Sequence, residues 1–285
     1  MHSHERASRM TSDHIANYTP NDVVAEDVLA HLTPAALQKP LRQHGPTPAW
    51  DGHIPFAFWC VERWKPRVLV ELGTHAGTSY FAFCQSVKEN GTGTNCFAVD
   101  TWQGDPHAKN YGDEIFDSVD QYNRENYKEF SQLLRMSFDE ALDQFADGSV
   151  DLLHIDGFHT YRAVRHDFES WLPKMGPRGV VLFHDSNVFR NNFGVWRLMR
   201  ELEKRFPYFH FPHSCGLSMF IVGPDAPEEA RWMAGLSGGK REIWRRVFAQ
   251  LGECTLQPDR LPKRRGLVSR MARSLRTRMR PWRPT

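Results

Sequence analysis

Apolar and polar residues follow one another in blocks that predict alternating strands and helices through the middle of the chain. Val68–Leu72 is a short, nearly continuous apolar run typical of a buried parallel strand, and Pro66 separates it from an apolar, aromatic helix predicted at Ile54–Trp64. Similar runs predict further strands at 96–99, 133–136, 150–155 and 179–183. Helical spacing of apolar residues predicts the intervening helices at 78–87, 122–130, 138–145, 161–172 and 195–206.

Two more strand-like segments, at 208–211 and 217–222, are joined by a short loop that contains Cys215 and Gly216. A connection this short cannot cross over to a parallel neighbour, so these strands should pair antiparallel. Alternating strands and helices followed by such a hairpin predict an α/β fold. We expect a doubly wound, mostly parallel, Rossmann-like sheet of seven strands with a C-terminal antiparallel hairpin.

The chain of 285 residues is long enough for one large α/β domain with extensions. We place that domain at 53–224. Residues 1–52 are predicted to form a polar segment with a lead-in helix at 23–37, and residues 225–259 a helical extension.

Composition argues for a cytoplasmic address. No window approaches the roughly 18 consecutive apolar residues of a membrane-spanning helix, and the polar start at 1–21 lacks the features of a secretory signal. The five cysteines are odd in number and form no C-x-x-C pair. They are expected to be buried, reduced thiols.

The basic residues are unevenly distributed. Residues 260–285 carry ten Lys or Arg and no acid, which leaves about −8 of the formal net charge of +2 on residues 1–259. The body therefore shows no sign of binding nucleic acid. Leu267, Val268, Met271, Leu275 and Met279 fall at helical spacing between arginines, which predicts peripheral contact with an anionic membrane at the inner face. A disordered solubilising tail and a helix docked on the acidic body are the alternatives.

A glycine-containing turn follows the first predicted strand, where the sequence from Glu71 to Ser79 reads ELGTHAGTS. Glycines let the backbone turn sharply and let a ligand approach closely, and the N–H groups at the next helix start point toward it. The spacing is E-x-G-x-x-x-G instead of the dinucleotide-binding G-x-G-x-x-G. Because an acid here would repel a pyrophosphate but not a cationic methionyl group, the turn predicts a site for S-adenosylmethionine (SAM).

Residues after the next two strands extend this predicted site. Asp100 stands at the second strand end, where such sheets bind a ribose diol, and Ser137 and Phe138 would flank an adenine. Glu71 or Asp100 alone could be an ordinary solvated carboxylate. Their joint occurrence in this order favours the cofactor site.

Two later strands end in residues suited to catalysis, within HIDGFHTY and HDSN. Neighbouring strands lie about 4.8 Å apart, so Asp156 and Asp185 can converge and could bind a divalent cation such as Mg²⁺. The metal would polarise an alcohol, and His159 or His184, with an ordinary imidazole pKa of about 6.5, could accept its proton. Helix capping for the aspartates and structural hydrogen bonding for the histidines are the alternatives. His154, inside the strand, is expected to be buried and structural.

These segments resemble the class I SAM-dependent methyltransferase family Methyltransf_24, which is related to macrocin-type and cephalosporin-cluster O-methyltransferases. The resemblance runs from Arg67 to Gly223 and is carried by VLVELGTHAGTSYFAFC, AVDTWQGD, MSFDEAL, DLLHIDGFHTYRAVRHDFESWLP, GVVLFHD and FGVWRL. It implies methyl transfer from SAM to an oxygen, with an active centre at Asp156, His159 and Asp185. The cofactor contacts that it implies are Glu71, Gly73, Gly77, Thr78, Ser79, Asp100 and Ser137, and we expect Thr74, Thr101, Trp102, Phe138 and Asp156 to line the same site.

The resemblance also bears on metal and acceptor. Relatives with a metal carry a third acidic ligand where this chain has Phe158, His184 or Ser186, so metal dependence stays open and His184 is either a substitute ligand or a base. Similar sequences occur with glycosyltransferases of bacterial polysaccharide assembly, which implies a sugar hydroxyl of a glycan or glycosylated metabolite as the acceptor. Aromatic residues that could stack on a sugar, or else pack internally, are Trp102, Tyr111, Tyr161 and Trp196.

A second enzyme class and a non-catalytic role are the alternative functions. An NAD-linked oxidoreductase on the same sheet is disfavoured by the spacing of the loop, and a non-catalytic SAM-fold scaffold in a glycan-assembly complex is disfavoured by the two aspartates. A homo-oligomer is compatible with the sequence.

Overall fold

A computed structural model of the chain describes residues 28, 30–37, 40, 49–104 and 112–256. The chain divides into two units, one of Pro34–Asp259 and the other of Met1–Thr33 with Arg260–Thr285. The sheet, the helices and the candidate site described below all belong to Pro34–Asp259. The basic tail, Tyr111 and residues 23–27 and 29 of the predicted lead-in helix lie outside the described residues.

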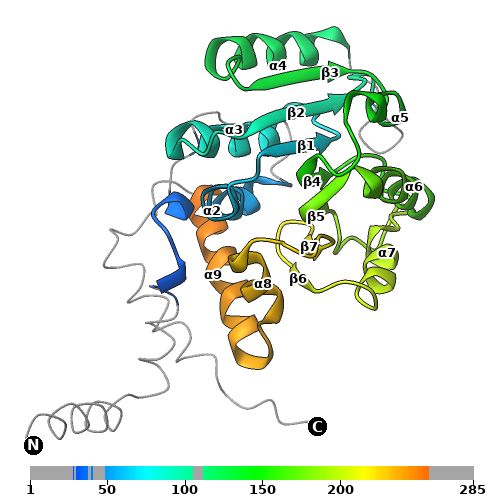
Figure 1. Cartoon of the computed structure of the whole chain (residues 1–285). Coiled ribbons are helices and arrows are strands. Elements are labelled where there is room, and N and C mark those ends of the chain that lie inside the picture. Colours follow the sequence, from blue (N-terminus) through cyan, green and yellow to red (C-terminus); the bar gives the residue numbers. More distant parts are fainter. Residues whose placement is uncertain (1–27, 29, 38–39, 41–48, 105–111, 257–285) are drawn as a thin grey trace, which may run out of the picture. The chain divides into compact units, whose positions relative to one another are not determined.

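Seven strands form one sheet in the order β3-β2-β1-β4-β5-β7-β6 (Figure 1). The strands are β1 (Val68–Leu72), β2 (Asn95–Asp100), β3 (Ser131–Arg135), β4 (Val150–Ile155), β5 (Met175–His184), β6 (Tyr208–Phe211) and β7 (Leu217–Ile221). The first five run parallel, whereas β7 is antiparallel to both β5 and β6. This is the predicted doubly wound sheet with its terminal hairpin, so the fold prediction is confirmed.

Helices connect the strands and follow the last one (Figure 1). They are α2 (Ile54–Trp64), α3 (Thr78–Asn90), α4 (Asp113–Asn126), α5 (Phe138–Ala141), α6 (Tyr161–Trp171), α7 (Val195–Leu202), α8 (Glu228–Gly235) and α9 (Gly238–Leu256). Short 3₁₀ turns occur at η1 (Ala35–Leu37), η2 (Asp51–His53), η3 (Leu142–Gln144) and η4 (Leu172–Lys174). In the part of the chain that the structure describes, no helix is long and apolar enough to cross a membrane.

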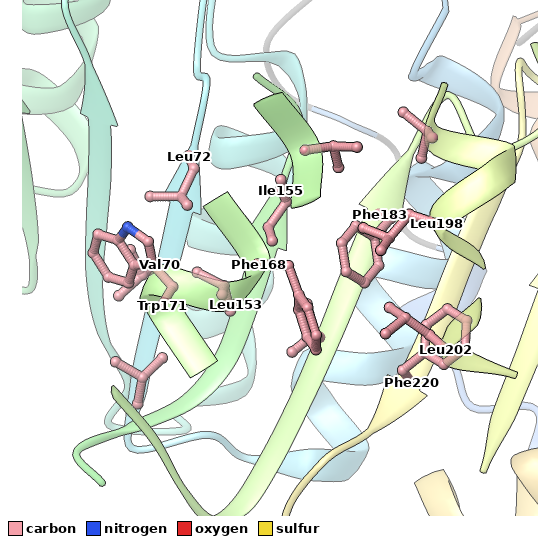
Figure 2. Packing of buried hydrophobic residues seen from close by; sticks show 14 of the residues in the cluster. Val70, Leu72, Leu153, Ile155, Phe168, Trp171, Phe183, Leu198, Leu202 and Phe220 are labelled. Carbon is pink, nitrogen blue, oxygen red and sulfur yellow. The ribbon is translucent and has the colours of Figure 1, made fainter. Parts of the chain in front are cut away.

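One face of the sheet packs against α6 and α7, and Figure 2 shows the side chains that meet there. Alternate residues of each strand point to this face because successive side chains of a strand point to opposite sides. The labelled members of the core are Val70, Leu72, Leu153, Ile155, Phe168, Trp171, Phe183, Leu198, Leu202 and Phe220. Burial of each such side chain stabilises the fold by about 1.5–3 kcal/mol, and this face anchors the strand ends that carry the site.

The opposite face is covered by α2 and α3, and α9 packs on α2. Ser86 of α3 donates a hydrogen bond to the carbonyl of Phe58 in α2 at 2.9 Å. Phe248 of α9 packs against Phe56 and Trp59, with ring centroids 5.5 and 5.8 Å apart. These contacts hold the C-terminal helices against the sheet-covering layer.

Three elements differ clearly from their predicted positions, and one of them is β3, which is Ser131–Arg135 where a strand at 133–136 was predicted. The helix predicted at 122–130 is α4, Asp113–Asn126, and its described residues bury only Val119 and Asn123, so an apolar pattern could not mark its start. Its acidic first turn, with Asp113 and Glu114, is stabilised by the helix dipole. The strand predicted at 179–183 is β5, Met175–His184, and so begins earlier than predicted. Its first residues include glycines and a proline, which are uncommon inside strands. The pairing of β5 with β4 also shifts in register here, between Val150 and Leu152 of β4.

The helices after β3 and β5 are shorter than predicted. Residues 138–145 are split between α5 and the 3₁₀ turn η3, and α7 ends at Leu202 instead of residue 206. Cys60, Cys84 and Cys96 are buried free thiols, as predicted. Cys215 and Cys254 are partly exposed, so that prediction is wrong for these two.

Candidate active site

The loop between β1 and α3 lies against the end of β4. Gly73 has a left-handed φ of 89°, and a Cβ added there would lie 2.3 Å from the backbone oxygen of Asp156. Gly77 is the N-cap of α3, also left-handed at φ 81°. The absence of a side chain at Gly73 therefore brings the predicted cofactor loop into contact with the predicted catalytic strand end.

Asp100, at the end of β2, is hydrogen-bonded to the backbone of this loop. Its Oδ2 accepts the backbone N–H groups of Thr74 and His75, both at 2.9 Å, and its Oδ1 accepts that of Trp102 at 2.7 Å. A ribose would have to share a carboxylate that already binds three amides, and this role stays a prediction. Trp102 is 1% exposed and its indole donates to the carbonyl of His75, so its predicted stacking on a sugar is wrong for this conformation.

Glu71 is not exposed and faces the side of the sheet that α2 and α3 cover. Its Oε2 lies 2.8 Å from Nδ1 of His154, its register partner on β4. Nε2 of His154 accepts a hydrogen bond from the indole of Trp50 at 3.2 Å. An indole only donates, so His154 carries its proton on Nδ1 and is neutral. His154 is buried, as predicted, and direct contact of Glu71 with a cofactor stays a prediction.

Ser137 and Phe138 begin α5. The Ser137 hydroxyl donates to Oε2 of Glu140 at 2.7 Å and accepts the Glu140 N–H at 3.3 Å, which makes a capping box. Thr78 and Ser79 open α3, and Thr101 follows β2. The contacts of these residues with a cofactor stay predictions.

The four predicted catalytic residues lie together at the carboxyl ends of β4 and β5. Nε2 of His159 lies 2.9 Å from Oδ2 of Asp185 and 3.3 Å from Oδ1 of Asp156. Nδ1 of His184 lies 3.1 Å from the same Asp156 oxygen. Asp185 has a left-handed φ of 54°, a conformation uncommon outside glycine and often found at functional sites. Two imidazoles and two carboxylates thus form one cluster.

His184 is held as an imidazolium by its surroundings. Nδ1 faces the Asp156 carboxylate, and Nε2 lies 3.3 Å from the carbonyl oxygen of Ser214. Both partners can only accept, so both ring nitrogens carry protons. Burial lowers the pKa of His184, but the Asp156 carboxylate outweighs it and raises the pKa above its ordinary value.

His159 is held in the same charged form. Its ring is stacked on Phe193, with centroids 4.7 Å apart and an interplanar angle of 7°. Burial lowers its pKa, but hydrogen bonds to Asp156 and Asp185 raise it to about 10. Burial likewise raises the pKa of Asp156, and the two imidazoles overcome this and hold it well below its usual range. The cluster therefore pairs positive and negative charges within one partly buried site.

His53 and the carbonyl group of Ser214 border this cluster, and the sequence did not predict their position. Nε2 of His53 donates to the carbonyl of Ser214 at 3.1 Å, the same oxygen that faces His184. Burial, with His213 and His184 close by, lowers the pKa of His53 well below its ordinary value. His53 and Ser214 are 161 positions apart in the chain. No motif links them, and only the hairpin of β6 and β7 brings them together.

Residues 70–186 match the Methyltransf_24 family, which is described as a methyltransferase domain. Over these residues the chain is similar to the methyltransferase domains of that family. A relative, the uncharacterized protein y4gI of Sinorhizobium fredii, is 46% identical over 243 residues. The match covers 85% of this chain, but the chain spans only 26% of the length of that relative.

Solved structures also resemble the fold that contains these residues. The SAH-bound methyltransferase PaMTH1 of Podospora anserina is 12% identical, with a TM-score of 0.46, over 72% of this chain and 97% of that one. The O-methyltransferase TomG of Streptomyces achromogenes, solved with SAM, is 12% identical, with a TM-score of 0.45, over 64% of this chain and 92% of that one.

The loop between β1 and α3 fits SAM. Thr74 is 3% exposed, and its hydroxyl has no hydrogen-bond partner among the described residues. A buried hydroxyl without a partner costs free energy, so a ligand that engages it gains affinity. Thr74 would hold the cofactor through its hydroxyl, and SAM would supply an electrophilic methyl group.

The cluster of two imidazoles and two carboxylates does not fit Mg²⁺ in its present arrangement. Asp156, His184 and Asp185 offer three ligand atoms within 4.8 Å of one another. Mg²⁺ takes oxygen ligands, and an imidazole nitrogen binds a metal only after losing its proton. Both nitrogens of His184 face acceptors, and Nε2 of His159 lies between the two carboxylates. In this arrangement the imidazoles are the groups that neutralise the two carboxylates.

Proposed function

We propose that this chain is a SAM-dependent O-methyltransferase in which His159 removes the proton of the acceptor hydroxyl. The observation that carries the proposal is the position of His159, with Nε2 at 2.9 Å from Asp185 and 3.3 Å from Asp156. The backbone of Asp156 also contacts the cofactor loop at Gly73. Base and methyl donor would therefore meet at one strand end, which in-line methyl transfer requires.

The proposed step needs the neutral form of His159. The imidazole takes the hydroxyl proton, the oxygen lone pair forms the new O–CH₃ bond, and the electrons of the S–CH₃ bond stay on sulfur, which leaves S-adenosylhomocysteine (SAH). Asp156 and Asp185 stabilise the imidazolium that forms. Because the same carboxylates raise the pKa of His159 to about 10, the fraction of neutral imidazole rises with pH and reaches one half near that value. The expected pH dependence therefore lies above that of an imidazole with the ordinary pKa of about 6.5.

The proposed acceptor is a sugar hydroxyl of a glycan. Phe189, in the loop after β5, is 65% exposed, and its ring packs against the partly buried Trp196 at 5.7 Å between centroids. Trp196 in turn donates to the carbonyl of Phe193, the residue stacked on His159. An exposed aromatic surface so close to the base suits the apolar face of a sugar ring. Tyr161 is less suited, since its hydroxyl donates to Glu201 at 2.9 Å and Arg197 lies 4.2 Å over its ring.

Methyl transfer from labelled SAM to a panel of glycans tests the proposal. We expect His159→Gln to lower the turnover rate by about 10²- to 10⁴-fold, as for loss of a general base, while calorimetry shows unchanged SAM affinity. The rate of the native chain should rise with pH toward about 10. His166→Gln, an exposed histidine on α6, is the control and should retain full turnover. A fully active His159→Gln variant would reject His159 as the base.

A metal-assisted reaction is the second candidate, favoured by the 4.8 Å grouping of Asp156, His184 and Asp185. Exhaustive chelation separates the two candidates. We expect turnover to survive it, because the imidazoles neutralise the two carboxylates. Loss of turnover that Mg²⁺ or Mn²⁺ restores would instead select the metal-assisted reaction.

A further inference from the structure

Asp167 is a buried carboxyl group that the proposed reaction does not use. It lies on α6, is 7% exposed, and its side chain makes no hydrogen bond or ion pair with the described residues. Most buried polar side chains are hydrogen-bonded to protein or water, so a carboxyl group at this depth without a protein partner has hydrogen-bonding capacity left for a ligand. A missing ligand is one physical explanation for such a group.

The position of Asp167 points to that ligand. Gly157 directly follows Asp156 at the end of β4, and a Cβ added to Gly157 would lie 2.5 Å from the Phe138 ring and 3.6 Å from Oδ2 of Asp167. The carboxyl therefore lies beside the residue next to the catalytic cluster. Phe138 opens α5, where the sequence predicts that an adenine is flanked. Asp167 thus borders the predicted adenine position from a different helix.

Few charges act on Asp167. His166, on the same helix, and Asp139, on α5, pair with each other at 2.8 Å, and both are exposed. Burial raises the pKa of Asp167 to about 7, with a lowering effect from His166 and a raising effect from Asp139. Near neutral pH the group is therefore often a carboxylic acid, which offers one O–H donor and one carbonyl acceptor.

We propose that Asp167 recognises the amino edge of the adenine of SAM. The N6 amino group donates and the adjacent ring nitrogen N7 accepts, a pattern that a carboxylic acid complements with two hydrogen bonds and a carboxylate cannot. This assignment rests on the proposed function, because the adenine is that of the methyl donor. It makes Asp167 a specificity-determining residue for the cofactor.

Calorimetry with SAH and with S-inosyl-L-homocysteine, in which an oxygen replaces the N6 amino group, tests the assignment at pH values below and above the Asp167 pKa of about 7. We expect the native chain to bind SAH more weakly as the pH rises through that value and to bind the inosyl analogue about tenfold more weakly than SAH at the lower pH. Asp167→Asn keeps one donor and one acceptor without titrating. It should bind SAH well at both pH values.

Asp167→Leu removes both hydrogen bonds and should bind SAH about tenfold more weakly at the lower pH. Glu169→Gln, an exposed residue on the same helix, is the control and should bind like the native chain. Thermal denaturation confirms that each variant is folded, and the Asp167→Asn pH profile decides the matter if Asp167→Leu does not fold.

Two results would overturn the assignment alone. One is SAH affinity that does not change with pH or with either Asp167 substitution. The other is equal affinity of the native chain for SAH and the inosyl analogue. A native chain that binds neither SAH nor SAM would overturn the proposed function, and the adenine assignment with it.

Discussion

At the scale of single residues, Asp100 shows how one carboxylate shapes a ligand loop. It accepts backbone N–H groups from Thr74, His75 and Trp102. His75 and Trp102 have left-handed φ values of 47° and 52°, so the loop adopts a conformation that its own residues do not favour. The hydrogen bonds to Asp100 offset that strain and hold the loop in the shape that SAM would meet.

Asp100→Ala should therefore weaken SAM binding through the loop as well as through any contact with the ribose. Hydrogen bonds to a charged group contribute about 1.5–3 kcal/mol each, so we expect a loss of affinity of at least roughly tenfold by calorimetry. The melting temperature should fall as well. Asp117→Ala, an exposed acid on α4, is the control. Native affinity in Asp100→Ala would show that the loop keeps its shape without this carboxylate.

At the scale of elements, the turn between β1 and α3 and the end of β4 form one unit. Gly73 combines a left-handed φ of 89° with a Cβ position 2.3 Å from the oxygen of Asp156. A backbone atom cannot yield as a flexible side chain can. Any displacement of the turn therefore also moves Asp156, and with it the imidazoles that share its carboxylate.

Gly73→Ala should destabilise the domain and abolish SAM binding, because it adds a steric clash to the cost of a left-handed alanine. Gly93→Ala is a matched control, since Gly93 has a φ of 72° and nothing within 4 Å of its Cβ position. The control should show only the conformational cost, about 1–2 kcal/mol. Equal melting temperatures of the two variants would mean that the turn moves away from β4 easily.

The elements that the sequence predicts best are those buried on both sides. β1 and β4 have the predicted limits, because their short apolar runs allow no other placement. α4 was misplaced because its exposed surface carries little periodic signal, and the start of β5 was missed because Pro177 and its glycine neighbours resemble a turn. The elements that position the site thus follow from hydrophobic pattern alone.

Some residues of the candidate site can be predicted from local sequence and others cannot. Asp156 and Asp185 were predicted to converge because each directly follows a strand of the parallel sheet, and they do lie together. The contacts of His53 and Ser214 depend on how the terminal hairpin folds back, which no local pattern encodes. The charged state of His159 was also beyond prediction, since it depends on distances between side chains from two strands.

At the scale of the whole molecule, the cluster makes stability depend on pH. The pKa of His159 is raised to about 10, so its contribution is complete below its unfolded value of about 6.5 and is lost as the pH rises toward 10. The pKa of Asp156 is lowered, so its contribution is present above about 3.8 and is lost on acidification. Stability from this pair is therefore greatest between these limits.

Melting temperatures measured across pH should accordingly fall between about pH 7 and 10. Asp167 has a pKa of about 7 and so finishes its own titration at the start of that interval. His159→Gln should flatten the decline there, whereas Asp117→Ala, at an exposed position of α4, should leave it in place. An unchanged alkaline slope in His159→Gln would mean that other groups cause the decline.

The hydrogen bonds from Trp50 through His154 to Glu71 contain a proton whose exchange with solvent can be measured. The Nδ1 proton of His154 lies between a ring and a carboxylate that are both wholly inaccessible to water. Such a proton exchanges with deuterium only when the covering layer opens. The exchange lifetime of this proton, measured by nuclear magnetic resonance, would therefore report how often that layer opens. A longer lifetime on adding SAH would show that a ligand bound at the strand ends makes this opening rarer.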